Sequence, residues 1–247
     1  MKYFFVSDIH GQYDRLIDAL DAAQFDKDKD TLVSLGDPFD RGHQSLEVLQ
    51  FLLSCPNKIL IWGNHDLRLK DLVAERSYVQ TYDYHNGVLE TFQSFLGWGE
   101  KLTSIQIGID FLNTREIAAQ LWQYFDQCVY AAEWSNLIAT HAWIPFSEPW
   151  QEASRAEWYE TTWENTHSNY KLFFQYVPKS LIVGHWHAWR FKEKNDGPID
   201  FSTFVGGDNT KQFIAIDGCS NAANGLINVY VYETEEEPSL VTGIKFL

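Results

Sequence analysis

The heptapeptide Gly36-Asp37-Pro38-Phe39-Asp40-Arg41-Gly42 follows the apolar run 31–35 and precedes a stretch with helical spacing at 45–54. Glycine at both ends allows a sharp turn, so that the carboxylates of Asp37 and Asp40 can point into one cleft. Two acids beside the fixed cation of Arg41 suggest a site for a metal and a phosphate group. An acidic turn that caps the next helix is the alternative interpretation, and other stretches must decide between them.

The segments on either side predict a parallel sheet. The apolar run 3–6 ends in Asp8-Ile9-His10, and the run 58–62 ends in Gly63-Asn64-His65-Asp66. Helical spacing at 12–23 and 45–54 separates these strands, an alternation typical of right-handed βαβ units. Ligands of parallel sheets bind at the carboxyl ends of the strands. We therefore expect one edge of the sheet to gather Asp8, His10, Asp37, Asp40, Arg41, Asn64 and His65.

From residue 67 to about residue 133 the alternation stops, and helical patches appear at 88–96 and 115–128. We interpret this region as a helical cap inserted over the site, with ordinary peripheral helices as the alternative. Strands are expected at 136–140, before His141, and at 180–183, before Gly184-His185-Trp186-His187. Three further strands, interpreted as antiparallel, are expected at 213–217, 228–233 and 240–246, with a hairpin loop at 233–238.

Length and composition limit the classes of protein. A chain of 247 residues with 45% hydrophobic residues can form one core, so we expect a single domain over 1–247. A net charge of −15 disfavours long nucleic acid or an anionic membrane as a partner. The three cysteines are far apart and form no disulfide framework or metal-binding pair. The first apolar run is too short for a signal peptide or a membrane span, so a cytoplasmic location is expected.

Histidines recur where the predicted strands end. Five of the eight occupy such positions, namely His10, His65, His141, His185 and His187. One such residue is more often a hydrogen-bonded structural histidine, but the set stands together with acids and an asparagine. Imidazole, carboxylate and amide donors without thiolate suit manganese, iron or zinc. The donors exceed the needs of one ion, which favours two divalent metal ions roughly 3.5–4 Å apart with a bridging carboxylate.

Five motifs, in order, are Asp8-Ile9-His10, the heptapeptide, Gly63-Asn64-His65-Asp66, His141 and Gly184-His185. In order and spacing they resemble the calcineurin-like metallophosphoesterases. The ending Asp40-Arg41-Gly42 resembles the phosphoprotein phosphatase branch, which includes bacterial serine/threonine phosphatases and symmetric diadenosine tetraphosphate hydrolases. The motifs extend over most of the chain, and five of them in the family's order form a specific signature.

The resemblance implies a four-layer α/β fold, in which two mixed β-sheets pack together and are flanked by helices. It implies that Asp8, His10 and Asp37 hold a first metal, and that a second is held by Asp37 as a bridge, Asn64, His141 and His185. It also implies that His65 is the general acid, that Asp40 orients it, and that Arg41 grips the phosphate. The reaction so implied is in-line attack on phosphorus by a metal-bridging hydroxide.

The chain departs from that branch in three places, one of which is Pro38-Phe39, where the branch usually has another pair. Gly184-His185 is followed by Trp186-His187, the form of the wider metallophosphoesterase group, so His187 is either a further ligand of the first metal or a hydrogen-bonded residue at the rim. No second phosphate-binding arginine is evident, and Arg68, Arg115 and Arg190 are the candidates. Asp66 is either a partner of the metal ligands or a helix N-cap.

The leading functional hypothesis is a metal-dependent phosphatase that hydrolyses phosphomonoesters, of the serine/threonine protein phosphatase type. The alternative is symmetric hydrolysis of diadenosine tetraphosphate, so the expected partner is a phosphoprotein, a small phosphoester or a dinucleoside polyphosphate. Trp143, Trp150, Trp158, Tyr159 and Trp163 offer an adenine-stacking face, although such clusters are more often core or interface. A non-catalytic protein-binding scaffold is the third hypothesis, disfavoured because every motif ligand is present. Oligomeric state stays open.

Overall fold

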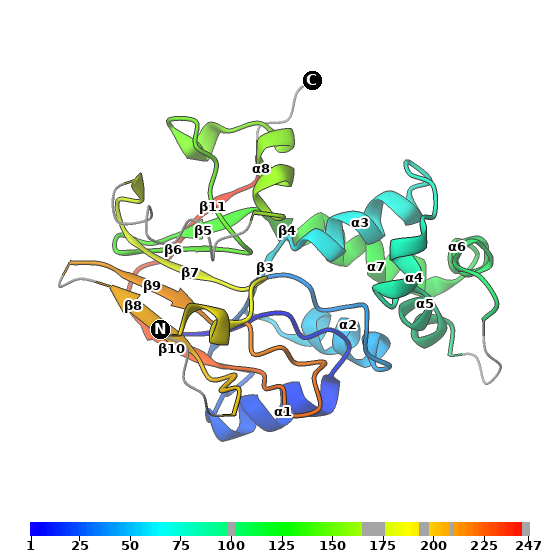
Figure 1. Cartoon of the computed structure of the whole chain (residues 1–247), viewed down its shortest axis with the longest axis horizontal. Coiled ribbons are helices and arrows are strands. Elements are labelled where there is room, and N and C mark those ends of the chain that lie inside the picture. Colours follow the sequence, from blue (N-terminus) through cyan, green and yellow to red (C-terminus); the bar gives the residue numbers. More distant parts are fainter. Residues whose placement is uncertain (98–101, 165–175, 193–197, 208–209, 244–247) are drawn as a thin grey trace.

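Eleven strands form two sheets in the computed structural model, which describes residues 1–97, 102–164, 176–192, 198–207 and 210–243 (Figure 1). The strands are β1 (Lys2–Val6), β2 (Thr31–Ser34), β3 (Lys58–Ile61), β4 (Cys128–Val129), β5 (Ala131–Glu133), β6 (Leu137–Thr140), β7 (Ser180–Val183), β8 (Phe204–Gly207), β9 (Gln212–Ala215), β10 (Tyr230–Glu233) and β11 (Ser239–Val241). One sheet has the order β10-β1-β2-β3-β4 and the other the order β11-β5-β6-β7-β9-β8. Both are mixed: in the first only the edge strand β10 is antiparallel to its neighbour, and in the second the parallel strands β6, β7 and β9 have antiparallel strands on both sides.

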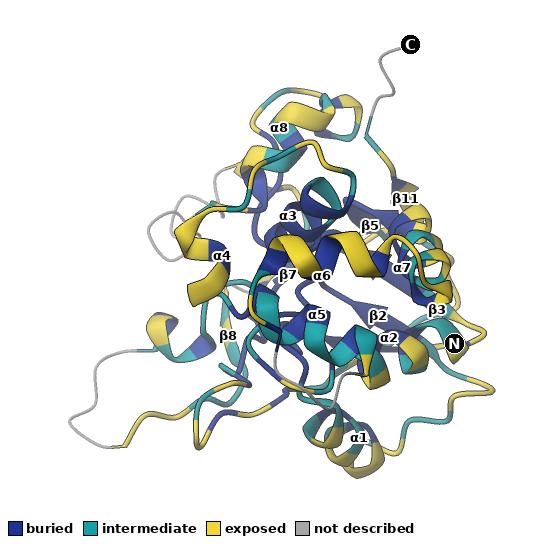
Figure 2. Ribbon diagram, turned by 90° about the vertical axis from the view of Figure 1, so that its right-hand side faces the viewer, coloured by how far each residue is buried: buried dark blue, intermediate teal, exposed yellow. Residues whose placement is uncertain are grey.

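The two sheets pack face to face over an apolar layer. Alternate residues of each strand point into it, for example Tyr3 and Phe5 from β1, because successive side chains of a strand point to opposite faces. Trp134 lies between the sheets, with its ring centre 5.0 Å from that of Tyr3 and 5.6 Å from that of Phe5. The opposite faces pack on helices, so most strands are buried on both sides (Figure 2). The predicted four-layer architecture of two mixed sheets flanked by helices is confirmed.

The helices lie outside the sheets (Figure 1). They are α1 (Tyr13–Ala22), α2 (Ser45–Ser54), α3 (Asn64–Val73), α4 (Thr81–His85), α5 (Val88–Leu96), α6 (Ile105–Leu112), α7 (Glu116–Gln127) and α8 (Arg155–Thr161), with 3₁₀ turns at Trp150–Glu152 and Ala188–Phe191. The α1 and α2 helices end within one residue of the predicted bounds. Their apolar stripes, with Leu16 and Leu20 in α1 and Leu49 and Leu52 in α2, are buried against β1 to β3, as helical spacing predicts.

Three expectations about the later elements are wrong. The helical insertion ends at Gln127, since residues 128–133 form β4 in one sheet and β5 in the other. The loop 233–238 is no hairpin, because β10 pairs with β1 whereas β11 pairs with β5. The β9 strand is parallel to β7 and antiparallel only to β8. Of the strand expected at 240–246, residues 244–247 lie outside the described part of the chain.

A buried ion pair joins the helices α3 and α4. Arg68, on α3, donates from Nε to Asp83 Oδ1 at 2.8 Å and from Nη2 to Asp83 Oδ2 at 2.7 Å. Asp83, on α4, is fully buried and also accepts from the backbone N–H of Gln80 at 2.7 Å. Two parallel bonds fix the guanidinium plane, so this pair sets the position of α4 relative to α3.

In the described segments, no helix is both long enough and apolar enough to span a membrane.

We expect Asp83→Ala to lower the free energy of unfolding by about 3–5 kcal/mol, because Arg68 would keep its buried charge without a carboxylate to balance it. Chemical denaturation monitored by circular dichroism measures the change. Asp200→Ala is the matched control, since it removes the exposed pair between Lys192 and Asp200 and should change stability little. An equal loss of unfolding free energy in the two variants would contradict the large contribution to stability expected of the Arg68–Asp83 pair.

Candidate metal centre

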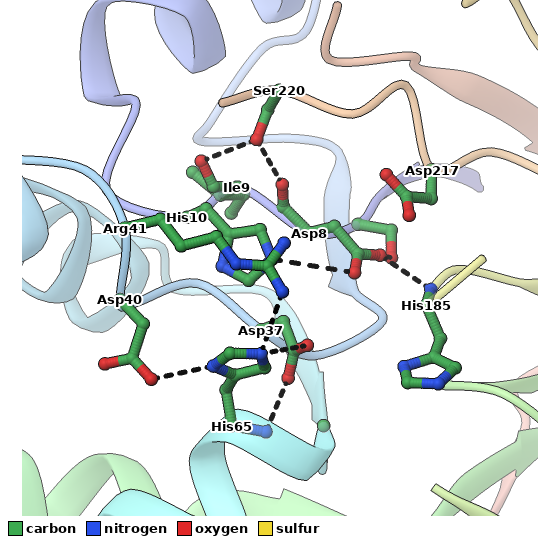
Figure 3. A network of polar contacts seen from close by, with 12 residues as sticks. Asp8, Ile9, His10, Asp37, Asp40, Arg41, His65, His185, Asp217 and Ser220 are labelled. Carbon is green, nitrogen blue, oxygen red and sulfur yellow. Dashed lines mark hydrogen bonds and ion pairs between the residues drawn. The ribbon is translucent and has the colours of Figure 1, made fainter. Parts of the chain in front are cut away.

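Loops that follow β1, β2, β3, β6 and β7 converge at one edge of the two sheets (Figure 3). Several of their residues have left-handed backbone conformations, in which a side chain is normally disfavoured. The φ angles are +49° at Asp8, +47° at His10, +55° at Asp37, +68° at Asp40, +64° at Arg41 and +62° at His185. Strained backbone of this kind clusters where a site needs side chains aimed in fixed directions.

Close backbone contact between two loops positions Asp37. A Cβ atom on Gly63 would lie 2.0 Å from Asp37 Oδ1, and one on Gly36 would lie 2.5 Å from the nitrogen of Gly63. Only glycine fits at these positions. The backbone N–H of His65 then donates to Asp37 Oδ1 at 2.9 Å. The loop after β2 and the start of α3 are therefore held together around this one carboxylate.

Asp37 belongs to two clusters of side chains with mutual spacings suited to metal binding. One contains His10, Asp37 and His65, and the other contains Asp37, His141 and His185, with donor atoms within 4.8 Å of one another in each. Asp37 Oδ2 lies 3.9 Å from His65 Nε2 and 3.5 Å from His141 Nε2. The structure thus brings His65, expected as the general acid, into the first cluster.

Hydrogen bonds orient two imidazoles toward the interior of the site. His10 Nδ1 donates to the carbonyl of Phe39 at 2.8 Å, and His141 Nδ1 donates to the carbonyl of Leu35 at 2.6 Å. Both rings therefore present Nε2 to the clusters, the arrangement typical of metal-ligating histidines. Asp8 Oδ1 lies 4.0 Å from His10 Nε2, and Asp8 Oδ2 accepts from the hydroxyl of Ser7 and from the backbone N–H of His185 at 2.8 Å.

One contact tests whether a cation fits. His141 Nε2 lies 2.9 Å from Asn64 Oδ1, and since Nδ1 already donates, the two atoms can attract only with a proton or a metal ion between them. Burial lowers the pKa of His141, but the charge of Asp37 outweighs it and raises that pKa to about 9. The donor set of imidazole, carboxylate and amide oxygen fits a divalent ion at this position.

The charge balance also favours cations. Burial, helped by the charge of Asp217, raises the pKa of Asp8 to about 7. Burial alone would raise the pKa of Asp37 as well, yet the charges of His141 and His65 hold it well below its usual range. A divalent ion in the same place would stabilise both carboxylates in their charged form.

His65 and Asp40 form a pair at the start of α3. His65 Nδ1 donates to Asp40 Oδ2 at 2.7 Å, and the hydroxyl of Thr91 donates to Asp40 Oδ1 at 2.9 Å. Arg41 Nη2 lies 3.2 Å from His65 Nε2. Burial and Arg41 lower the pKa of His65, but Asp37 and Asp40 outweigh them and the net effect raises it. Thr91, which sequence reasoning missed, gives Asp40 a fixed orientation.

His187 lies outside both clusters. Its Nδ1 donates to Asp217 Oδ2 at 2.9 Å and its Nε2 lies 3.5 Å from Cys219 Sγ, although it borders the same cavity as Asp8. Its role as a metal ligand stays a prediction. Asp217 lies two residues after the end of β9, and sequence reasoning missed it by counting it as the last residue of a strand. Ser220, also missed, donates to the carbonyls of Asp8 at 2.5 Å and Ile9 at 3.1 Å (Figure 3).

Asp66 holds the ligand loops in place instead of serving as an N-cap. Gly63 is the N-cap of α3, and Asp66 is the third residue of the helix. Its Oδ2 accepts from the backbone N–H groups of Asp37 at 3.0 Å and Gly63 at 2.9 Å, and its Oδ1 accepts from the hydroxyl of Tyr124 at 3.1 Å. Asp66 therefore supports the backbone on which Asp37 stands.

The cavity over the clusters has a volume of about 250 Å³ and includes Arg41, Trp163 and Trp186 in its lining. Of the residues that offered an adenine-stacking face, Trp143, Trp150 and Trp158 are buried in the core, so the core alternative holds for them. The tryptophans that border the cavity are Trp163 and Trp186. Trp163 is 43% exposed, and Trp186 was not among the residues expected to form a stacking face.

Of the candidates for a second phosphate-binding arginine, only Arg190 lies near this cavity by a described contact. Its guanidinium is 5.2 Å from the ring centre of Trp186 and 4.9 Å from that of Trp189. Arg68 is held by Asp83, away from the clusters. Arg115 is the N-cap of α7.

Comparison with known proteins defines the class. The chain belongs to the calcineurin-like phosphoesterase family, whose profile matches residues 1–197. Symmetrical bis(5'-nucleosyl)-tetraphosphatases of Salmonella paratyphi B and Klebsiella pneumoniae are each 36% identical to it over 110 residues, or 43% of this chain. The match spans 39% of the length of those relatives.

Two solved structures share the fold. One is a candidate diadenosine tetraphosphatase, with a TM-score of 0.61 and 18% identity, covering 99% of this chain and 95% of that one. The other is a cold-active protein-tyrosine phosphatase from a psychrophilic Shewanella, with a TM-score of 0.58 and 16% identity, covering 97% of this chain and 80% of that one. At these identities the likeness is one of fold.

We expect Asp40→Asn to lower the pKa of His65, because the carboxylate that favours the imidazolium is lost while an acceptor for Nδ1 remains. The fraction of protonated His65 near neutral pH should fall accordingly. Titration of the His65 ring resonances by NMR in the metal-free protein measures this shift. Asp200→Asn, at an exposed position, is the control, and an unchanged pKa in Asp40→Asn would contradict the proposed coupling.

Proposed function

We propose that the protein is a dinuclear-metal-dependent phosphoesterase. The observation that carries this proposal is the place of Asp37, whose carboxylate belongs to both clusters of buried donor atoms. A carboxylate shared in this way is the usual bridge of a two-metal site. Membership of the calcineurin-like phosphoesterase family supports the same chemistry.

In this proposal Asp8, His10 and Asp37 hold a first divalent ion, with His187 as a further ligand. Asp37, Asn64, His141 and His185 hold a second. Manganese, iron and zinc suit these donors. When bound, the two ions supply positive charge for the phosphoryl oxygens and lower the pKa of the attacking water.

The chain's own residues then bind and protonate the substrate. Arg41 offers a planar fork of donors for two phosphoryl oxygens and stays charged throughout. His65, with its pKa raised, donates a proton to the departing oxygen, and Asp40 holds its ring through Nδ1. Arg41 Nη2 and His65 Nε2 lie 3.2 Å apart, which supports a joint action of the two residues on one phosphoryl group.

For the substrate we infer a dinucleoside tetraphosphate hydrolysed symmetrically, in preference to a phosphomonoester on a protein. Trp163 and Trp186 border the cavity that contains Arg41 and give a purine ring a surface for stacking. The relatives named as symmetrical tetraphosphatases support this choice. A phosphoserine or phosphothreonine protein remains the second candidate, since Arg41 and His65 suit any phosphoric ester.

Asp37→Asn should lower kcat by at least about a thousandfold, because several kcal/mol of metal-supplied charge stabilisation would be lost and each 1.4 kcal/mol is about tenfold. Metal content after manganese loading, measured by mass spectrometry, should fall below two ions per chain. A chelator should abolish wild-type activity, and manganese should restore it. Asp200→Asn should behave as the wild type, and full metal content in Asp37→Asn would speak against a bridging role.

The ratio of kcat/KM for diadenosine tetraphosphate to that for a phosphoserine peptide should lie well above one with manganese supplied. Trp163→Ala should reduce this ratio roughly tenfold, because stacking of one base contributes about 1–3 kcal/mol. Tyr78→Ala removes another exposed aromatic ring and should leave the ratio unchanged. A ratio well below one would instead favour the protein phosphatase candidate.

A further inference from the structure

A second cavity adjoins the candidate metal centre. It has a volume of about 370 Å³ and is lined by Arg41, His43, Tyr84, His85, Gly87, Glu90 and Asn221. Arg41 also lines the first cavity, with Trp163 and Trp186. The residue proposed to grip the phosphate therefore borders two spaces on its two sides.

The wall between the cavities is built of tightly packed backbone. The N–H of Arg41 donates to the carbonyl of Asn86 at 3.1 Å, and a Cβ atom on Gly87 would lie 2.3 Å from the nitrogen of Arg41. Gly87 has a φ of +82°, so the turn between α4 and α5 requires glycine for both reasons. Asn86 faces the first cavity, whereas His85 and Gly87 border the second. The helical insertion thus divides the site in two.

Glu90, in the first turn of α5, carries an unsatisfied acceptor. Its Oε2 is buried and has no hydrogen-bond partner in the described part of the protein, although the residue lines the second cavity. A buried carboxylate oxygen without a donor costs free energy. Rotation of the carboxylate about the last side-chain bond, a broad two-fold torsion, would let a ligand hydroxyl in the cavity donate to the carboxylate group of Glu90. The other polar groups of the cavity include the imidazoles of His43 and His85 and the guanidinium of Arg41, which suit a phosphate chain.

We propose that this second cavity binds the ribose of one end of the substrate, with a ribose hydroxyl donating to the Glu90 carboxylate, while the other nucleoside end lies beside Trp163 and Trp186. The proposal rests on the proposed function, because it needs a substrate with a nucleoside at both ends of its phosphate chain. Tyr84, which is 42% exposed and lines the cavity, offers a ring for the base. The phosphates between the two ends would pass Arg41, the one residue common to both linings.

The test compares diadenosine tetraphosphate with its analogue that lacks the 2'- and 3'-hydroxyls of both riboses. The wild type should prefer the ribose substrate about tenfold in kcat/KM, as expected for a hydrogen bond to a charged acceptor. In Glu90→Ala that preference should fall close to one, and in Glu90→Gln, which keeps the shape of the side chain and a neutral acceptor, it should be intermediate. Glu116→Gln, which changes an exposed acid in the first turn of α7, should keep the wild-type preference.

An unchanged preference in Glu90→Ala and Glu90→Gln would overturn the inference while leaving the proposed function intact. Absence of diadenosine tetraphosphate hydrolysis by the manganese-loaded wild type would overturn the proposed substrate and this inference together. Selective loss of activity in Glu90→Gln toward a phosphopeptide with a basic residue, without any effect of the ribose hydroxyls, would show that the carboxylate pairs with a cation and would also overturn the inference.

Discussion

The close approach of the loops after β2 and β3 is the constraint on which the site depends. Gly36 and Gly63 leave no room for side chains, and the carboxylate of Asp37 occupies the space so defined. Asp66 holds both loops together, because its Oδ2 accepts from the backbone N–H groups of Asp37 and Gly63. Because the parallel strands beneath fix the loops in register, Asp37 reaches both histidine clusters without any adjustment of the fold.

The site is held in a conformation that the isolated loops would avoid. Left-handed backbone at a residue with a side chain costs about 1–3 kcal/mol, and Asp8, His10, Asp37, Asp40, Arg41 and His185 all adopt it. The apolar layer between the sheets, with Trp134 at its centre, is rigid enough to hold these turns. The same geometry aims the donors in advance, so that little reorganisation is needed when a substrate or an ion binds.

The first half of the fold was predictable from the sequence, because continuous apolar runs that end in loop residues mark β1, β2 and β3, and apolar residues at a period of 3.6 mark α1 and α2. The β4 and β5 strands have two and three residues, too few to show any period, and the chain changes sheets between them. The ligand candidates were found because they follow predicted strands. Asp217 and Thr91 were missed because their importance arises from contacts between distant segments, which no local pattern records. The sequence left open whether Trp143, Trp150 and Trp158 form a stacking face or part of the core, because burial, unlike aromatic content, is decided by tertiary packing.

The pairing of β1 has a consequence for biosynthesis. This strand lies between β2, which follows it closely, and β10, which is formed by residues near the other end of the described chain. A polypeptide that is synthesised from its amino terminus therefore exposes one edge of β1 until residues 230–233 have been translated. An apolar strand with an open edge is prone to pair with other chains, so this interval is the one in which the nascent protein is most exposed to aggregation.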